Sequence, residues 1–178
     1  MAETRAWRWV AVPVLVGALV SLSAGLLARH EPRSKGYFRL FFSDPVHLKA
    51  GFATAAVILA CFQLFTAAWI FRRLPWQKPA WVNPAHRWSG RVAVLLTLPA
   101  AYHCIFKLGF ATYDARAAIH SALGAAFYGA LFAKVFIVRS SNHPGWSLPM
   151  AGATLFAILT LLWFTSAFWM FSAMGVSL

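Results

Sequence analysis

The chain has 178 residues, of which 61% are hydrophobic and only 11% are charged. An average soluble domain carries about 25% charged residues, so this composition is typical of a chain embedded in lipid. The charge is strongly basic, with 16 Lys and Arg against four Asp and Glu, and no acid lies within a long apolar run. Proton-relay transporters usually place a carboxylate inside the membrane, so a carboxylate-based pump is disfavoured. The expected partner of the basic residues is the lipid bilayer with its anionic headgroups, and not nucleic acid.

Five apolar segments follow one another, and each is long enough for a transmembrane helix, which needs about 20 residues. The first helix is expected over 7–29 as an uncleaved span, because its apolar run exceeds the core of a signal peptide. Three more spans occupy 44–138, and a last span covers 146–174. The runs are continuous and not alternating, which favours helices over barrel strands. We therefore predict a single all-α membrane domain of about five transmembrane helices.

The basic residues also indicate an orientation. Nine of them fall on the N-terminal side of a five-span chain and seven on the opposite side. The positive-inside rule therefore favours a cytoplasmic N-terminus, and the expected location is a prokaryotic cytoplasmic membrane.

Three of the six histidines precede a glycine by four residues. In two of these units the preceding Asp44 or Asn83 is expected to cap a helix, with proline at the first helical position. A spacing of four places histidine and glycine on one helix face, so the imidazole projects while the glycine leaves flat space beside it. A haem ring needs such space, although small residues also let helices pack closely. The three units are His47 with Gly51, His86 with Gly90, and His120 with Gly124.

The donor types favour haem b over a metal ion. Zinc and copper sites recruit clustered Cys, carboxylate or His, whereas these histidines stand on separate spans without acids. Haem iron needs only one or two axial ligands, commonly histidine. Cys61 and Cys104 lie outside any C-x-x-C-H motif, which excludes covalent haem attachment and favours buried thiols.

Depth in the membrane restricts which histidines can share one iron. His86 and His103 stand on one helix, roughly 26 Å apart at 1.5 Å per residue, and cannot do so. In a five-span chain His103 lies near the same membrane face as His47 and His120. A bis-histidine haem is therefore expected at that face, with His47 and His103 competing to pair with His120.

The opposite face offers a less complete ligand set. His86 lies there, and a second ligand would be His143, in a turn before Pro144, or Met150. The sequence thus predicts one or two haems. His30 lies in a basic connector and is expected to be solvated.

Four basic residues stand beside these ligands. Each is suited to pair with a haem propionate through a charge-assisted hydrogen bond. Snorkelling towards lipid headgroups is an equal alternative for each of them. The four are Lys49, Arg87, Lys107 and Arg116.

These motifs resemble those of the cytochrome b561 and ferric-reductase-like membrane cytochromes. The likeness covers residues 44–139. The unit that begins at His47 is similar to the first ligand helix of that family. The unit His120-Ser121-x-x-Gly124 is similar to its His-Ser-x-x-Gly ligand helix, two spans later.

The resemblance implies a four-helix haem-binding core in which histidines pair on alternate helices. It pairs His47 with His120, and His86 with a residue on the final span. The chain departs from the family pattern, because its final span has no internal histidine, His103 is an additional one, and five spans replace six.

The sequence therefore predicts a membrane-embedded b-type cytochrome. It would transfer electrons between quinone or a donor protein and an acceptor at the membrane face, including as the haem-bearing anchor subunit of a respiratory complex. Redox partner proteins or complex subunits are expected. The alternative is a cofactor-free structural or assembly subunit of a membrane complex, and a small transporter is a third interpretation.

Overall fold

The computed structural model describes residues 2–30, 36–140 and 142–174, and in these residues all regular structure is helical. Five helical spans are long and apolar enough to cross a membrane, which confirms the predicted all-α membrane bundle. Two spans contain a short π-helical segment, labelled η. The elements are α1 (Ala2–His30), α2 (Pro45–Ile70), α3 (Val82–Tyr102), η1 (His103–Leu108), α4 (Ala115–Arg139), α5 (Ser147–Trp163), η2 (Phe164–Phe168) and α6 (Trp169–Met174).

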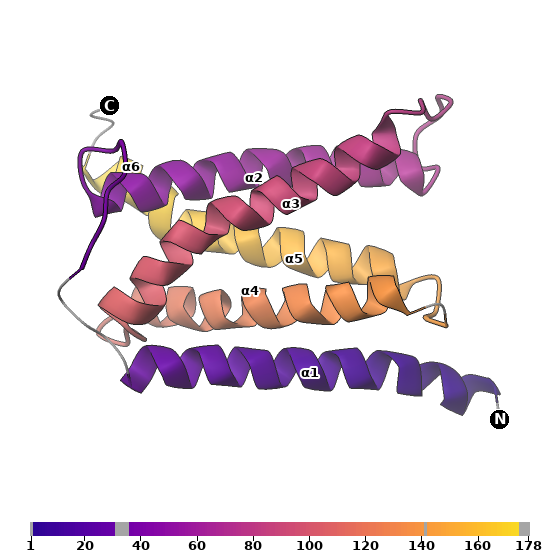
Figure 1. Cartoon of the computed structure of the whole chain (residues 1–178), viewed down its shortest axis with the longest axis horizontal. Coiled ribbons are helices and arrows are strands. Elements are labelled where there is room, and N and C mark those ends of the chain that lie inside the picture. Colours follow the sequence, from indigo (N-terminus) through magenta and orange to yellow (C-terminus); the bar gives the residue numbers. More distant parts are fainter. Residues whose placement is uncertain (1, 31–35, 141, 175–178) are drawn as a thin grey trace.

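Because the number of spans is odd, α1 begins and α6 ends at opposite ends of the bundle (Figure 1). We call the end that holds the start of α1 the N-terminal end. The α2–α3 connector and the α4–α5 turn also lie there. The other end, here the C-terminal end, holds residues 36–44, the η1–α4 connector and α6.

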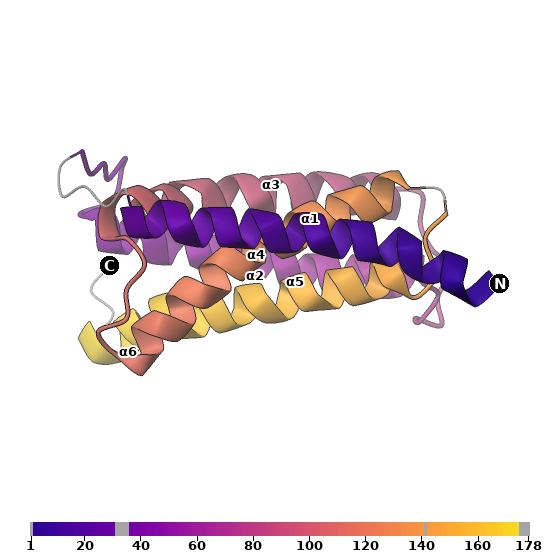
Figure 2. The same cartoon turned by 90° about the horizontal axis from the view of Figure 1, so that it is seen from below.

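The helices pack as neighbours in the order α3, α2, α5, α4, α1. Helix α1 contacts α4: it forms one side of the bundle in Figure 1, and in Figure 2, seen from below, it lies in front of α4. Helix α3 packs along α2, and α5 contacts both α2 and α4. The apolar core lies between these last three helices, and its buried residues are Ala56, Phe127, Leu155 and Leu159.

Small residues bring α1 and α4 into backbone contact. A Cβ atom added to Gly17 would lie 2.7 Å from the carbonyl oxygen of Gly129, and one added to Gly129 would overlap Gly17 and Ser21. Close backbone approach of this kind is a main source of helix association in lipid, where no hydrophobic force draws helices together. Helix α1 therefore packs chiefly against α4 and lies outside the group formed by α2, α3, α4 and α5.

The expected cap at Asp44 is present, and a second aspartate caps α4. The Asp44 carboxylate caps α2, and the side chain of Asp114 accepts from the backbone N–H of Ala117 at 2.6 Å at the start of α4. In both cases the carboxylate satisfies amide donors that have no partner in the first helical turn.

The predicted cap at Asn83 is wrong. Helix α3 begins at Val82, two residues before the expected first helical residue Pro84, and the N-cap residue Trp81 makes no side-chain capping bond. Asn83 instead accepts a hydrogen bond from Nζ of Lys78 at 3.2 Å. The turn before it has already started the helix, since the N–H of Val82 donates to the carbonyl of Pro79.

The sequence predicted ordinary helices where η1 and η2 lie, and both π-helical segments are at the C-terminal end. In η2 the hydroxyl of Thr165 donates to the carbonyl of Leu161 at 2.9 Å, and that of Ser166 to Leu162 at 2.6 Å. Segment η1 ends at Gly109, whose φ of 75° is readily adopted only by glycine. Single π turns of this kind are frequent at functional sites.

Candidate functional site

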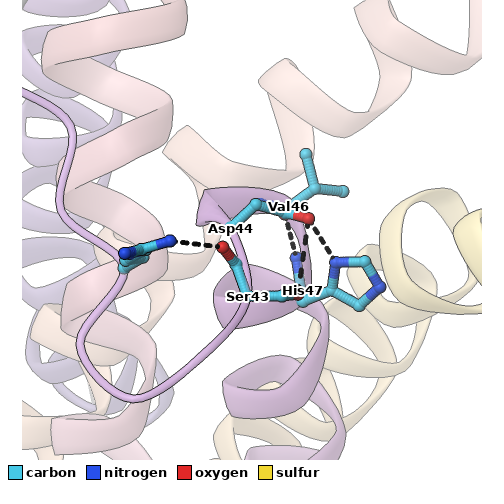
Figure 3. A network of polar contacts seen from close by, with 5 residues as sticks. Ser43, Asp44, Val46 and His47 are labelled. Atoms are coloured by element: carbon cyan, nitrogen blue, oxygen red, sulfur yellow. Dashed lines mark hydrogen bonds and ion pairs between the residues drawn. The ribbon is translucent and has the colours of Figure 1, made fainter. Parts of the chain in front are cut away.

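His47 is held by the residue that caps its own helix (Figure 3). The Asp44 carboxylate accepts the backbone N–H groups of Val46 at 2.7 Å and His47 at 2.9 Å, and it lies 2.6 Å from the imidazole Nδ1. These bonds, led by the backbone N–H of His47, hold the pKa of the Asp44 carboxyl below its ordinary value of 3.8. Asp44 is therefore an anion at neutral pH and accepts the Nδ1 proton, which directs Nε2 away from the cap.

His120 is held by a hydroxyl on the last span. Its Nδ1 lies 3.0 Å from Oγ1 of Thr165, and that hydroxyl already donates its single proton to the carbonyl of Leu161. With the hydroxyl proton assigned to that carbonyl, the Thr165 oxygen accepts and the imidazole donates from Nδ1. The neutral ring of His120 then carries its lone pair on Nε2, the nitrogen that a metal would bind.

His86 repeats this arrangement at the N-terminal end. Its Nδ1 lies 2.7 Å from Oγ1 of Thr66 on α2, whose proton is donated to the carbonyl of Phe62 at 2.9 Å. The Nε2 atom of His86 again carries the lone pair. Gln63 supports the same turn, because its amide donates to the carbonyl of His86 and, at 2.6 Å, to Oγ of Ser89.

His143 lies just before α5, at the same end as His86. Its Nδ1 is 3.2 Å from Oγ of Ser147 and 3.2 Å from the carbonyl of Pro144. Ser147 is buried and donates its own proton to that carbonyl at 2.6 Å, so both oxygens accept from Nδ1. The contacts are long, but they select the same tautomer as in His86.

His103 differs from these four residues. It is completely buried, its Nδ1 lies 2.8 Å from the carbonyl of Pro99, and its Nε2 accepts the backbone N–H of Phe38 at 3.4 Å. The rings of Tyr37 and Phe38 pack against the imidazole, with centroids at 5.8 and 4.4 Å. His103 thus has both ring nitrogens engaged, Nδ1 within its own span and Nε2 with Phe38, which it ties to the third span. His30 is exposed at the end of α1.

The ends of the bundle therefore group the histidines as their depth in the sequence predicted. His47, His103 and His120 lie at the C-terminal end, as does the exposed His30, and two, His86 and His143, lie at the N-terminal end. Among the described residues no group of three or more His, Cys, Asp or Glu gathers as in a metal-ion cluster. Four histidines present one tethered and one unengaged ring nitrogen: His47, His86, His120 and His143.

The space expected beside each ligand is present at one of the three glycines. A Cβ added to Gly124 would meet no atom within 4 Å. At Gly51 the position is filled by the ring of Phe42, 2.6 Å away, and at Gly90 it is 3.0 Å from the side-chain oxygen of Gln63. The open surface one turn after His120 makes this helix face the best suited to a flat ligand.

Two of the four candidate cations are engaged at the C-terminal end. The Arg116 guanidinium donates to the carbonyl of Thr165 at 2.8 Å and stacks 3.9 Å from the ring of Trp169. Arg116 therefore fixes η2, which carries the partner of His120. Lys107 lies 5.2 Å from the ring centroid of Tyr102.

The other two candidate cations differ in depth. Lys49 is partly buried, and its ammonium group interacts electrostatically with the imidazole of His120 and the thiol of Cys104. Arg87 is exposed. Both cysteines are free thiols as expected, although Cys61 faces outward and is not buried. Lys49, like Arg116, is thus a candidate cation that interacts electrostatically with His120, whose Nε2 is unengaged.

Four residues of these sites are not among those predicted from the sequence. The hydroxyls of Thr66, Thr165 and Ser147 hydrogen-bond three of the histidines. They could have been recognised as hydroxyl residues that lie at the same membrane depth as a histidine. Lys134 is the fourth, a partly buried cation on α4 that interacts electrostatically with His86.

Taken together, the apolar spans and the histidines at both ends define an integral membrane helical bundle. The chain belongs to DUF6529, a family of unknown function, which matches residues 10–178. No curated protein and no solved structure matches the chain. The likeness to cytochrome b561 therefore rests on the histidine motifs alone and stays a prediction.

Proposed function

We propose that this chain is a membrane-embedded b-type cytochrome, with His47 and His120 as axial ligands of a haem at the C-terminal end. Haem supplies one-electron chemistry when bound. The chain supplies the ligands, a low-dielectric helical sheath and the charges around them. Electrons would pass between quinone or a donor protein and an acceptor at the membrane face, with the chain acting as a redox subunit or anchor of a larger complex.

The orientation of the imidazoles is the observation that carries this proposal. Metal-ligating histidines almost always donate their second ring N–H to a carboxylate, carbonyl or similar acceptor, which fixes the tautomer and leaves the other nitrogen for the metal. His47 does so to Asp44, and His120 does so to Thr165. All three histidines of the His-x-x-x-Gly units share this state, whereas His30 and His103 do not.

The same observation favours His47 over His103 as the partner of His120. To bind iron, His103 would have to break its bond to Phe38 and open a site that is completely buried. His47 retains partial exposure, with 30% of its side chain accessible, and has no competing bond at Nε2 among the described residues. This agrees with the pairing of alternate helices that the motif resemblance implies.

A second haem at the N-terminal end would use His86 with His143. Both imidazoles donate from Nδ1, to Thr66 and to Ser147 respectively. Met150, the other candidate from the sequence, is 57% exposed on α5 and is less suited to a buried ligand position.

Charged residues of the chain have distinct roles in this proposal. Lys49, beside His120, is placed to neutralise a propionate, and Arg116 positions the ligand indirectly by holding the Thr165 turn. Asp44 makes His47 a stronger electron donor through the Nδ1 bond. A cytoplasmic N-terminus in a prokaryotic cytoplasmic membrane remains the expected orientation from the basic residues.

The test is the visible absorption spectrum of the detergent-purified chain, produced with haem supply ensured. We expect the sharp reduced bands of six-coordinate low-spin haem b. His30→Ala, a control outside both sites, should leave the haem content unchanged. A colourless preparation would reject the cytochrome proposal and favour the cofactor-free structural subunit.

A further inference from the structure

The last residues of α2 and the connector to α3 line a half-open surface cavity of about 430 Å³ at the N-terminal end of the bundle. This volume is within the range of small-molecule sites, roughly 300–1,000 Å³. The lining combines the indoles of Trp69 and Trp76 with the polar side chains of Arg72, Gln77 and Lys78. None of the proposed haem ligands lines it, so the cavity is separate from the sites described above.

The tryptophans that line this cavity are held in place by contacts with one another. The indole N–H of Trp69 donates to the carbonyl of Trp76 at 3.2 Å, and the Trp69 ring packs edge-on against Trp76 and Trp81, with centroids at 6.3 and 6.0 Å. Tryptophan is enriched at the depth of lipid headgroups because its ring is amphipathic. The cavity therefore lies where a span ends and the headgroup layer begins.

The charge of the lining is positive and has no internal counter-ion. Arg72 and Lys78 are both exposed, and the cavity has no acidic lining residue. The two carboxylates whose side chains the structure describes, Asp44 and Asp114, lie at the opposite end of the bundle. An anion that pairs with these cations must therefore come from outside the described residues.

Arg72 also has an uncommon backbone conformation. Its φ is +54°, a left-handed value that only a few per cent of non-glycine residues adopt. Its N–H donates to the carbonyl of Trp69 at 3.1 Å, which closes the end of α2. The turn thus fixes the guanidinium stem at the rim of the cavity, and such strain is often found at ligand sites.

We propose that this cavity binds the headgroup of an anionic phospholipid, with its phosphate between Arg72 and Lys78 and its glycerol backbone against Trp69 and Trp76. A bound lipid would also brace the last turns of α2. Thr66 lies there, three residues before Trp69 and on a neighbouring position of the helix surface, and it holds His86. The site would thereby couple lipid composition to the N-terminal histidine pair.

The experiment compares the whole chain in nanodiscs of phosphatidylglycerol and of phosphatidylcholine, with retained lipid counted by native mass spectrometry. We expect wild type to retain phosphatidylglycerol preferentially and to melt at a higher temperature with it. Each basic residue near an anionic membrane surface contributes about fivefold to binding, so Arg72→Asn and Lys78→Gln should each weaken retention by about that factor. Asn tolerates the left-handed turn, and Gln keeps a donor for Asn83.

The matched control is Arg73→Asn, which removes the same charge one residue away, at an exposed arginine that does not line the cavity. It should retain phosphatidylglycerol like wild type. Equal losses in the control and the two variants would overturn the proposal, because they would indicate only a basic surface. So would binding of inorganic phosphate without any preference of wild type for phosphatidylglycerol, a result that needs no variant to fold.

Discussion

The two ends of the bundle orient their histidines in the same way but by different chemistry. At the C-terminal end the partners include an anion, Asp44, and the neighbouring Thr165 lies in a π-helical segment fixed by Arg116. At the N-terminal end Thr66 and Ser147 are neutral hydroxyls in or beside regular helices. The histidine tautomer therefore depends on a hydrogen-bond acceptor at the same membrane depth as the imidazole. This acceptor can be charged or neutral.

The largest expected effect comes from removing one ligand at each end. His120→Ala should abolish low-spin haem at the C-terminal end, and His86→Ala should remove only a haem bound at the N-terminal end, because the two residues lie at opposite ends of the bundle. Haem quantification with redox titration of each variant measures this. His103→Ala is the comparison variant, since its imidazole has no unengaged nitrogen. Normal low-spin haem in His120→Ala, or loss in His103→Ala alone, would refute the assignment of ligands.

Filling the space beside His120 should have the next largest effect. Gly124→Leu keeps the ligand but places a side chain where no atom now lies within 4 Å, so haem content at the C-terminal end should fall. Gly152→Leu is a matched control on α5, because Gly152 also has no atom within that distance. Haem content and melting temperature distinguish the two. A loss of haem that is equal in both variants would mean that Gly124 has no special role.

Removing the hydroxyl acceptors should act more weakly. Mutation of such partners typically lowers metal affinity 10- to 100-fold, so Thr165→Val should weaken haem binding at the C-terminal end by about that factor and Thr66→Val at the other end. Thr165→Ser should restore binding, because it keeps the hydroxyl. The measurements are the haem dissociation rate and the midpoint potential of each variant. Unchanged values in both valine variants would show that the hydroxyls do not orient the imidazoles.

The smallest effect is expected at Asp44. Asp44→Asn keeps a capping oxygen but loses the charge, so helix stability should change little while the haem potential rises. Asp44→Ala should cost about 0.5–2 kcal/mol of stability as well. The pKa of this carboxyl is lowered by folding, so its contribution is complete above pH 3.8 and is lost as pH falls through the folded value. Equal stability of wild type and Asp44→Ala near neutral pH would contradict this role of the cap.

Several features of this protein follow from the sequence by itself. The long uncharged runs require helices, because lipid leaves no other way to satisfy the backbone of a single span. The number of spans then assigns each histidine to one end, and Asp44 and Asp114 cap their helices because the capping bond is local in sequence. Local chemistry and the bilayer thickness are sufficient for these inferences.

Only the tertiary structure distinguishes the histidines from one another. The engagement of His103 depends on Phe38, 65 residues away, and the tautomer of His120 depends on Thr165, 45 residues away. The cap expected at Asn83 failed for a different and local reason, since the turn at Pro79 starts the helix first. Which ring nitrogen is unengaged is decided by contacts between separate helices, because each imidazole donates to whatever acceptor the packing brings to its depth.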